Sequence, residues 1–201
     1  MRIILDAGHG GLHPTTKQYV TPGKRSPKFD DGTVLYEGVN NRDNVNRIYE
    51  ALKEKGYDVV KLVDTWRDIK LSERANKEHL LATKDSILIS IHSDGFGNGR
   101  DWNEANGMGC FIYTNASTKS HKLADSLNNS FICHFDGICK NRGIKKRSFA
   151  ILRNTLSPAV LLELGFHTNK RECELMQTED FKEKLVKSII EAIEEYKLKT
   201  K

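Results

Sequence analysis

Short runs of apolar residues alternate along this chain with segments whose apolar positions recur every three or four residues. The strongest runs are 3–5, 57–63, 87–91 and 159–164, and two weaker runs cover 110–113 and 149–152. Uninterrupted apolar runs of this length, bounded by Gly, Asp and Asn, are typical of parallel strands that are buried on both faces. The pattern therefore predicts a sheet of about six strands.

Helical spacing marks the segments between these runs. The first predicted helix begins near Glu37 and ends at Gly56, which can adopt the left-handed conformation that closes many helices. Two more helices are expected over about 71–82 and 118–132. The last begins after Thr178, a suitable N-cap. Its predicted buried face consists of Phe181, Leu185, Ile189, Ala192, Ile193 and Tyr196.

Strands that alternate with helices predict an α/β fold. We expect an open, mostly parallel twisted sheet with helices on both faces, which gives three layers. A length of 201 residues suits a single domain over 1–201. The stretches 10–31 and 94–108 carry most of the Gly, Pro and Asn, so we expect surface loops there, each following the end of a strand.

Charge and cysteine content exclude several classes of protein. The net charge of +5 favours anionic partners, but the densest basic segment, Lys140 to Arg147, has no interleaved aromatic residues. We therefore interpret that segment as a solvated loop and expect no nucleic-acid partner. The four cysteines form no C-x-x-C pair, which argues against a zinc ribbon or redox motif. No apolar run is long enough to cross a membrane.

Polar clusters follow three of the strongest apolar runs. Asp6 and His9 come after the first, His92 and Asp94 come after the third, and Glu163 lies within the last. The carboxyl ends of strands in an open α/β sheet are where ligands bind, so these side chains should meet at one edge. Glycines on both sides of His9 leave its imidazole free to act as a ligand, although a lone histidine is more often simply hydrogen-bonded.

Glu163 needs a partner because an unpaired buried carboxylate costs several kcal/mol. That partner is either a Lys or Arg in a buried ion pair or a metal cation. A catalytic zinc takes three N or O ligands and keeps one position open. His9 and His92 with Glu37 as third ligand supply such a set, and Glu163 then remains free to move protons.

The chain resembles the zinc-dependent N-acetylmuramoyl-L-alanine amidases of the Amidase_3 type. The matching pieces are Ile3 to Gly11, Glu37 at a helix start, Arg74 to Asn76, Ser90 to Ser93, and Pro158 to Asn169, in the family's order. The resemblance implies one Zn²⁺ per chain, held by His9, Glu37 and His92, with Glu163 as the catalytic carboxylate. It also implies that the substrate is peptidoglycan, cut between the lactyl group of N-acetylmuramic acid and L-alanine.

Two departures from the family pattern affect these expectations. The segment between His9 and Glu37 is longer than in many members, and Ser93-Asp94 follows His92 where a small residue and Asn are more common. Glu37 is consequently the least secure ligand. We further expect Lys145, Arg153 and His167 to contact substrate, because they lie near the proposed site in sequence.

Other interpretations stay open at this point. A zinc peptidase acting on stem or crosslink peptides would use the same groups, and an inactive wall-binding module would share the fold. We expect a monomer without a separate wall-binding domain. Peptidoglycan lies outside the cytoplasm and the chain begins without a leader, so we expect either a phage endolysin released from the host cytoplasm or a secreted bacterial enzyme whose leader has been removed.

Overall fold

A six-stranded sheet forms the centre of the computed structural model, which describes residues 1–200. Its strands are β1 (Arg2–Ala7), β2 (Asp58–Lys61), β3 (Ser86–Asp94), β4 (Met108–Ile112), β5 (Asn141–Lys146) and β6 (Ala159–Phe166). They are ordered β2-β1-β3-β6-β4-β5, and all neighbours are parallel except β4 and β6. The predicted open, mostly parallel sheet is confirmed.

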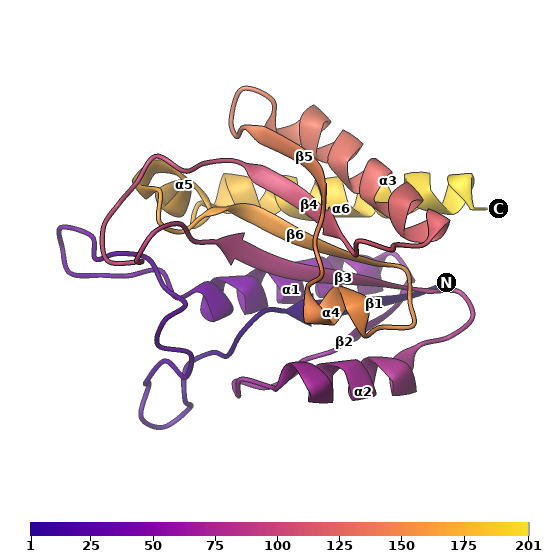
Figure 1. Cartoon of the computed structure of the whole chain (residues 1–201), viewed down its shortest axis with the longest axis horizontal. Coiled ribbons are helices and arrows are strands. Elements are labelled where there is room, and N and C mark those ends of the chain that lie inside the picture. Colours follow the sequence, from indigo (N-terminus) through magenta and orange to yellow (C-terminus); the bar gives the residue numbers. More distant parts are fainter. Residues whose placement is uncertain (201) are drawn as a thin grey trace.

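Helices cover both faces of this sheet (Figure 1). They are α1 (Glu37–Glu54), α2 (Leu71–Leu81), α3 (Thr118–Phe135), α4 (Ala150–Arg153), α5 (Lys170–Leu175) and α6 (Glu179–Lys199). The long helices α1, α3 and α6 pack together on one face, whereas α2 and the short α4 lie over the other. This arrangement confirms the predicted three layers.

The two faces of the sheet bury two separate apolar cores. Successive side chains of β1 alternate between them, so that Ile3 and Leu5 join the large core under α1, α3 and α6 while Ile4 joins the smaller one under α4. Such two-sided burial explains why the strand sequences read as continuous apolar runs instead of alternating ones.

The predicted helix ends agree with the structure. The side chain of Thr178 accepts a hydrogen bond from the backbone N–H of Phe181, as expected of an N-cap. Gly56 has φ +77° and closes α1 in the left-handed region. The face of α6 predicted to be buried is buried at every one of its six positions.

One strand prediction is wrong. The apolar run 149–152 forms most of the short helix α4, and the sixth strand is β5, within the basic segment Lys140 to Arg147 that we interpreted as a solvated loop. The strand β5 lies at the edge of the sheet and pairs only with β4. An edge strand keeps one side in water, so lysine and arginine are tolerated there and the apolar signal of a strand is lost.

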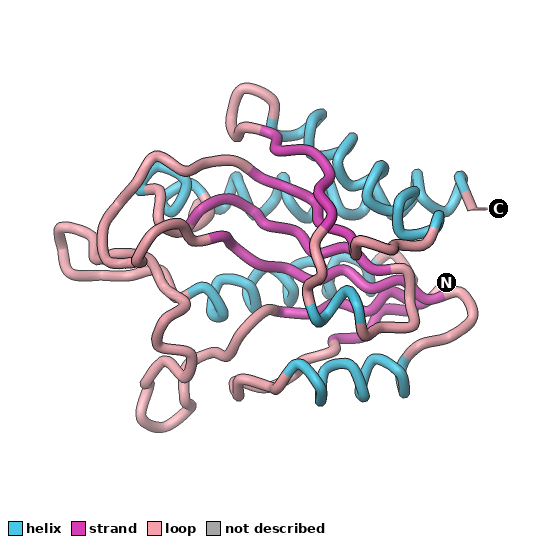
Figure 2. The backbone as a smooth tube through the Cα atoms, viewed as in Figure 1, coloured by secondary structure: helices cyan, strands magenta, loops and turns pink. Residues whose placement is uncertain are grey.

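Long loops gather beyond the carboxyl ends of the parallel strands β1, β2, β3 and β6, on the side opposite the two chain termini (Figure 2). The expected surface loops 10–31 and 94–108 contain only isolated bridges, Leu12 with Tyr19 and Arg25 with Tyr36, apart from the ends of strands β3 and β4. This edge of the sheet is the place where the sequence predicts the functional groups.

Candidate functional site

His9 stands just beyond the end of β1 in an unusual backbone conformation. Its φ is +63°, in the left-handed region that residues other than glycine seldom adopt. The conformation is held in place because Arg42 and Arg74 both donate hydrogen bonds to the carbonyl oxygen of His9, at 2.8 and 3.0 Å. Backbone strain retained in this way is characteristic of functional positions.

The glycine before His9 makes room for the second histidine. A Cβ atom at Gly8 would lie 2.2 Å from Cε1 of His92, which is too close for any side chain. The two imidazole rings meet edge to face, with centroids 5.1 Å apart. His92 belongs to β3, next to β1 in the sheet, so two adjacent strand ends deliver the two histidines.

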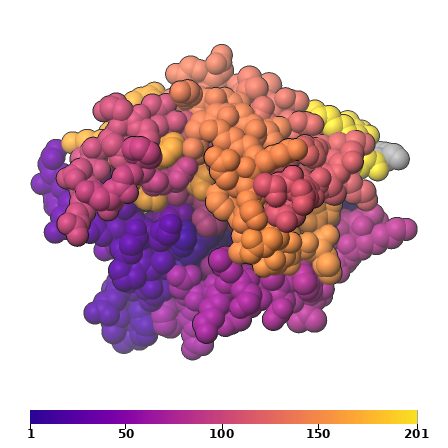
Figure 3. Space-filling view, in the orientation of Figure 1, coloured from indigo at the N-terminus to yellow at the C-terminus, as the bar shows by residue number. Residues whose placement is uncertain are grey.

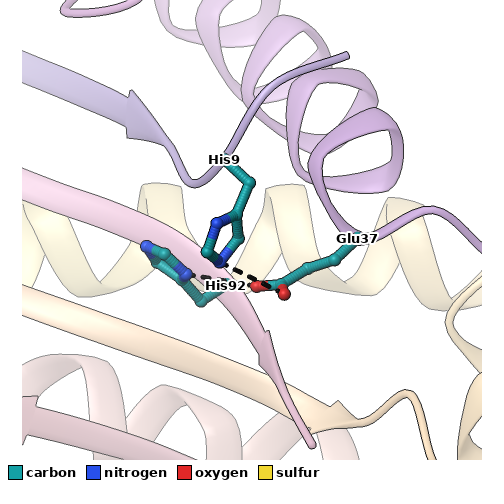
Figure 4. Close-up of side chains that lie close together, drawn as sticks. All are labelled: His9, Glu37 and His92. Carbon is teal, nitrogen blue, oxygen red and sulfur yellow. Dashed lines mark hydrogen bonds and ion pairs between the residues drawn. The ribbon is translucent and has the colours of Figure 1, made fainter. Parts of the chain in front are cut away.

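Glu37 is the first residue of α1, and its carboxylate points toward both histidines (Figure 4). Its Oε1 lies 3.2 Å from Nδ1 of His92 and accepts a hydrogen bond from the backbone N–H of Ser93 at 3.3 Å. Its Oε2 lies 3.2 Å from Nε2 of His9 but forms no hydrogen bond. Helix α1 approaches closely because Gly38 has no side chain: a Cβ there would lie 1.9 Å from the carbonyl oxygen of Gly10.

These three residues have the arrangement of a metal site. One ligand atom from each lies within 4.8 Å of the other two. Nitrogen and oxygen donors that converge in this way can share one cation such as zinc, which binds its ligands at about 2 Å. Although burial opposes ionisation, the close contacts and charges of His9 and His92 hold the pKa of Glu37 well below its usual range. The structure thus brings together the predicted ligands, including Glu37.

Glu163 is aligned with His92 across the pair β3 and β6. Its side chain is buried, and its Oε2 atom has no hydrogen-bond partner. Burial raises the pKa of Glu163 to about 8. Among residues 1–200 no Lys or Arg forms an ion pair with it, so the buried ion pair considered from the sequence is not found. The carboxyl group instead faces the same cavity as His9 and His92.

Another buried carboxylate, Asp6, has a structural role that the sequence does not reveal. Arg74 of α2 donates to Oδ1 of Asp6 and to the carbonyl oxygen of Ala7, and the hydroxyl of Ser90 donates to Oδ2 of Asp6 at 2.6 Å. The same guanidinium holds the backbone of His9. Arg74 belongs to one of the segments that resemble the family, but the sequence alone assigns it no role. Only the fold places it beneath the loop that carries His9.

The three predicted substrate contacts are placed differently from one another. His167 is buried, lines the cavity beside Glu37 and lies with Nδ1 3.0 Å from the hydroxyl oxygen of Ser93. Lys145 lies on the edge strand β5, paired with Phe111 of β4, and Arg153 bonds to Ser148 at the end of α4. Neither of these two lines the cavities that contain His9, His92 and Glu163. Their proposed contacts remain predictions.

Comparisons with known proteins agree with this geometry. Residues 3–195 match the family described as Amidase_3, N-acetylmuramoyl-L-alanine amidase. The crystal structure of an N-acetylmuramoyl-L-alanine amidase from Clostridium difficile superposes with a TM-score of 0.82 and 25% identity, covering 100% of this chain and 97% of that one. The fold of this chain thus occurs in a solved amidase structure that it matches over nearly the full length of both chains.

Two curated relatives are longer than this chain. The endolysin of Bacillus phage SPP1 is 27% identical over 200 residues, which cover 96% of this chain and 65% of that protein. The probable cell wall amidase LytH of Staphylococcus epidermidis is 24% identical, with coverage of 96% and 57%. The chain therefore spans roughly three fifths of the length of these two relatives.

The family match covers nearly the whole described chain, and it favours an amidase over the zinc peptidase considered above. The predicted ligand residues also occupy one cluster at the edge of the sheet where this fold class binds ligands. By its sequence and its fold, the chain belongs to the N-acetylmuramoyl-L-alanine amidases of the Amidase_3 family.

Proposed function

We propose that this chain carries out the amidase reaction of its family on peptidoglycan with one zinc ion held by His9, Glu37 and His92, and with Glu163 moving the proton. The observation that supports this most directly is the cluster of three ligand atoms within 4.8 Å beside a buried carboxyl group that has an unpartnered oxygen. Two imidazoles and one carboxylate form a donor set typical of catalytic zinc. They leave room for a fourth ligand.

A zinc ion in this position supplies a Lewis acid that polarises the scissile carbonyl and lowers the pKa of water. The residues around it are arranged to hold such a cation. Glu37 is fixed through Oε1 by the backbone N–H of Ser93, which leaves Oε2 free to bind metal. Asn41 donates to the carbonyl oxygen of Gly8 at 3.3 Å and so links α1 to the loop that carries His9.

Glu163 is suited to carry a proton from the attacking water to the departing amine. A divalent cation nearby favours the ionised carboxylate, which accepts a proton from water. The apolar surroundings favour the neutral carboxyl group that this proton transfer produces. The α-amine of L-alanine is a poor leaving group unless it is protonated. A single carboxyl group thus serves as general base in the first step and general acid in the second.

The proposal is tested with purified sacculi and zinc-loaded or chelator-treated protein, followed by mass analysis of the products. We expect intact stem peptides with a free N-terminal L-alanine, loss of activity on chelation, and recovery with zinc. A product in which stems remain on the sugar would indicate a peptidase instead. Activity that survives complete removal of metal would contradict the role of zinc.

Matched histidine variants test the ligand assignment. We expect His9→Ala to lose zinc and activity together, whereas His13→Ala should keep both, because His13 lies in the same loop but outside the cluster. Metal content measured by mass spectrometry decides between the two results. A His9→Ala protein that retains a full equivalent of zinc would remove His9 from the ligand set.

Action on the cell wall follows from the family. None of the helices among residues 1–200 combines the length and the apolar character needed to cross a membrane. We propose that the chain reaches the wall either as a phage endolysin or as a bacterial wall-remodelling enzyme, since relatives of both kinds match it. It needs no partner chain in the proposed reaction, because all four groups come from one chain.

A further inference from the structure

A cavity of about 520 Å³ extends from the candidate metal site across the face of the sheet that carries α2 and α4. His9, His92 and Glu163 line its inner end. Its apolar lining comes mainly from Leu71, Phe149, Ile151 and Leu161. Figure 3 shows the hollow where the N-terminal loop, the segment before α2 and the region of α4 meet. A cavity that begins at the reacting groups and is apolar further out has room for substrate on one side of the scissile bond.

The charges around this cavity are unevenly paired. Arg74 contacts two of the three acidic residues that line it: it donates to Asp6, and its Nη2 lies 3.9 Å from Oδ1 of Asp68. Lys24 and Lys70 also line the cavity, and both are exposed. Within residues 1–200 neither lysine forms an ion pair, so two ammonium groups are left without an anion.

The two lysines come from separate loops and converge on one opening. Lys24 belongs to the long segment between His9 and Glu37, and its carbonyl oxygen accepts a hydrogen bond from the backbone N–H of Glu37 at 2.9 Å. Lys70 directly precedes α2. Lys24 is therefore tied to the start of α1 at the candidate metal site, while Lys70 lies just before the start of α2.

The cavity on the other side of the metal site differs in its charges. It is smaller, about 250 Å³, and its wall includes Gly95, Gly97 and Gly99. Apart from Lys24, its charged residues are Glu37, Asp94 and Glu163, and Asp94 is paired with Arg142. The smaller cavity thus offers an anionic part of the substrate one lysine, Lys24, whereas the larger cavity offers two.

We propose that the larger cavity binds the peptide side of the scissile bond, with its apolar lining against the L-alanine side chain and with Lys24 and Lys70 binding a carboxylate of the following residue. This inference rests on the proposed function and names the part of the substrate that the larger cavity recognises. It makes the chain selective for stem peptides whose second residue carries a free carboxylate over stems in which that group is an amide.

The test compares two synthetic muramyl peptides that differ only in this carboxylate or amide, with the zinc-loaded chain. We expect kcat/KM to be higher for the acid. Lys24→Met and Lys70→Met should each raise KM for the acid about 2- to 5-fold, as expected for an exposed charge pair, and leave kcat and the amide substrate nearly unchanged. The double variant should lose the preference, and Lys24→Glu should reverse it.

Lys28→Met is the matched control, because Lys28 is an exposed lysine of the same loop that lies outside both cavities at the metal site. It should keep the preference for the acid. Equal kcat/KM for acid and amide with the wild-type chain would overturn the inference, and so would a double variant that folds and keeps the preference. Failure to hydrolyse either compound would instead count against the proposed function, so the two failures are distinguishable.

Discussion

Buried carboxylates in this protein fall into two groups that differ in how they are bonded. Asp6 and Glu172 are saturated: Asp6 is bonded through both oxygens to Arg74 and Ser90, and Glu172 accepts backbone N–H bonds from Gly107 and Phe166. Glu37 and Glu163 are equally buried, yet each has an Oε2 atom without a hydrogen bond.

The difference separates groups that support the loops from groups that act on a ligand. A buried polar atom without a partner costs about 1 to 3 kcal/mol, and a ligand that supplies the missing interaction removes this cost. The saturated carboxylates fix the backbone around the site. The open ones face a cavity that can hold a cation, water and substrate.

The sharpest test of the carboxylates that have an unpartnered oxygen is Glu163→Gln. Gln has nearly the same shape but cannot accept and return a proton, so we expect the rate of hydrolysis to fall about 10²- to 10⁴-fold while zinc remains bound. Turnover of a defined muramyl peptide and metal content are measured together, with the exposed Glu54→Gln as control. A variant that holds zinc and works at the wild-type rate would show that Glu163 does not move the proton.

The saturated group is tested by Arg74→Met. This change leaves Asp6 buried without its cation, and breaking a buried pair from one side costs about 3 to 5 kcal/mol in the free energy of unfolding. Urea denaturation measures that loss. Arg47→Met, which removes a partly exposed ion pair with Glu179, should cost about 1 kcal/mol or less. Similar losses in both variants would mean that Asp6 is not the structural anchor described here.

The pH dependence of stability distinguishes the two groups in metal-free protein. Burial raises the pKa of Glu163 from its ordinary 4.5 to about 8, so between these values the folded chain holds a proton that the unfolded chain has released. Folding is therefore favoured below this window, and stability falls as the pH rises through it. Gln does not titrate, so Glu163→Gln should become increasingly stable relative to wild type up to about pH 8 and then level off.

Urea denaturation in chelator, at pH values below, within and above that window, measures this difference. A difference between wild type and Glu163→Gln that stays constant with pH would show that the folded protein does not hold the extra proton.

The smallest expected effect concerns a single bond of the saturated group. Ser90→Ala removes the hydroxyl that donates to Asp6 at 2.6 Å and leaves Oδ2 unpartnered. We expect a loss of about 1 to 3 kcal/mol in the free energy of unfolding, with zinc binding unchanged. A variant as stable as wild type would mean that Asp6 tolerates an open oxygen as Glu163 does, and the contrast between the two groups would weaken.

Much of the candidate site could be predicted because parallel strands deliver their carboxyl ends to a single edge. His9 follows β1, His92 lies near the end of the neighbouring strand β3, and Glu163 is aligned with His92 on the next strand. Glu37 was less secure because the long segment before it hides its position from the sequence. The structure brings it into the cluster through the start of α1, which Gly38 allows to pack against the loop after β1.

The residues that contact substrate are harder to predict from the sequence than the metal ligands. Lys145 and Arg153 are predicted to contact substrate because they lie close along the chain to the last motif. Of the three predicted contact residues, only His167 lines a cavity at the site. Lys24 and Lys70 line the larger cavity although nothing in the local sequence marks them. Surface lysines in loops carry no periodic signal, and their position depends on how distant loops pack against each other.

The order of apolar and polar residues by itself determined the layers and the main strands, because burial on both faces of a sheet leaves a strong signal, and it singled out His9, Glu37, His92 and Glu163 as candidates. Tertiary structure alone decided the edge strand β5, the short helix α4, the Asp6 and Arg74 anchor and the two cavities. Each of these depends on contacts between segments far apart in the chain. Local residue patterns do not encode such contacts, since their free energy arises only when the segments meet.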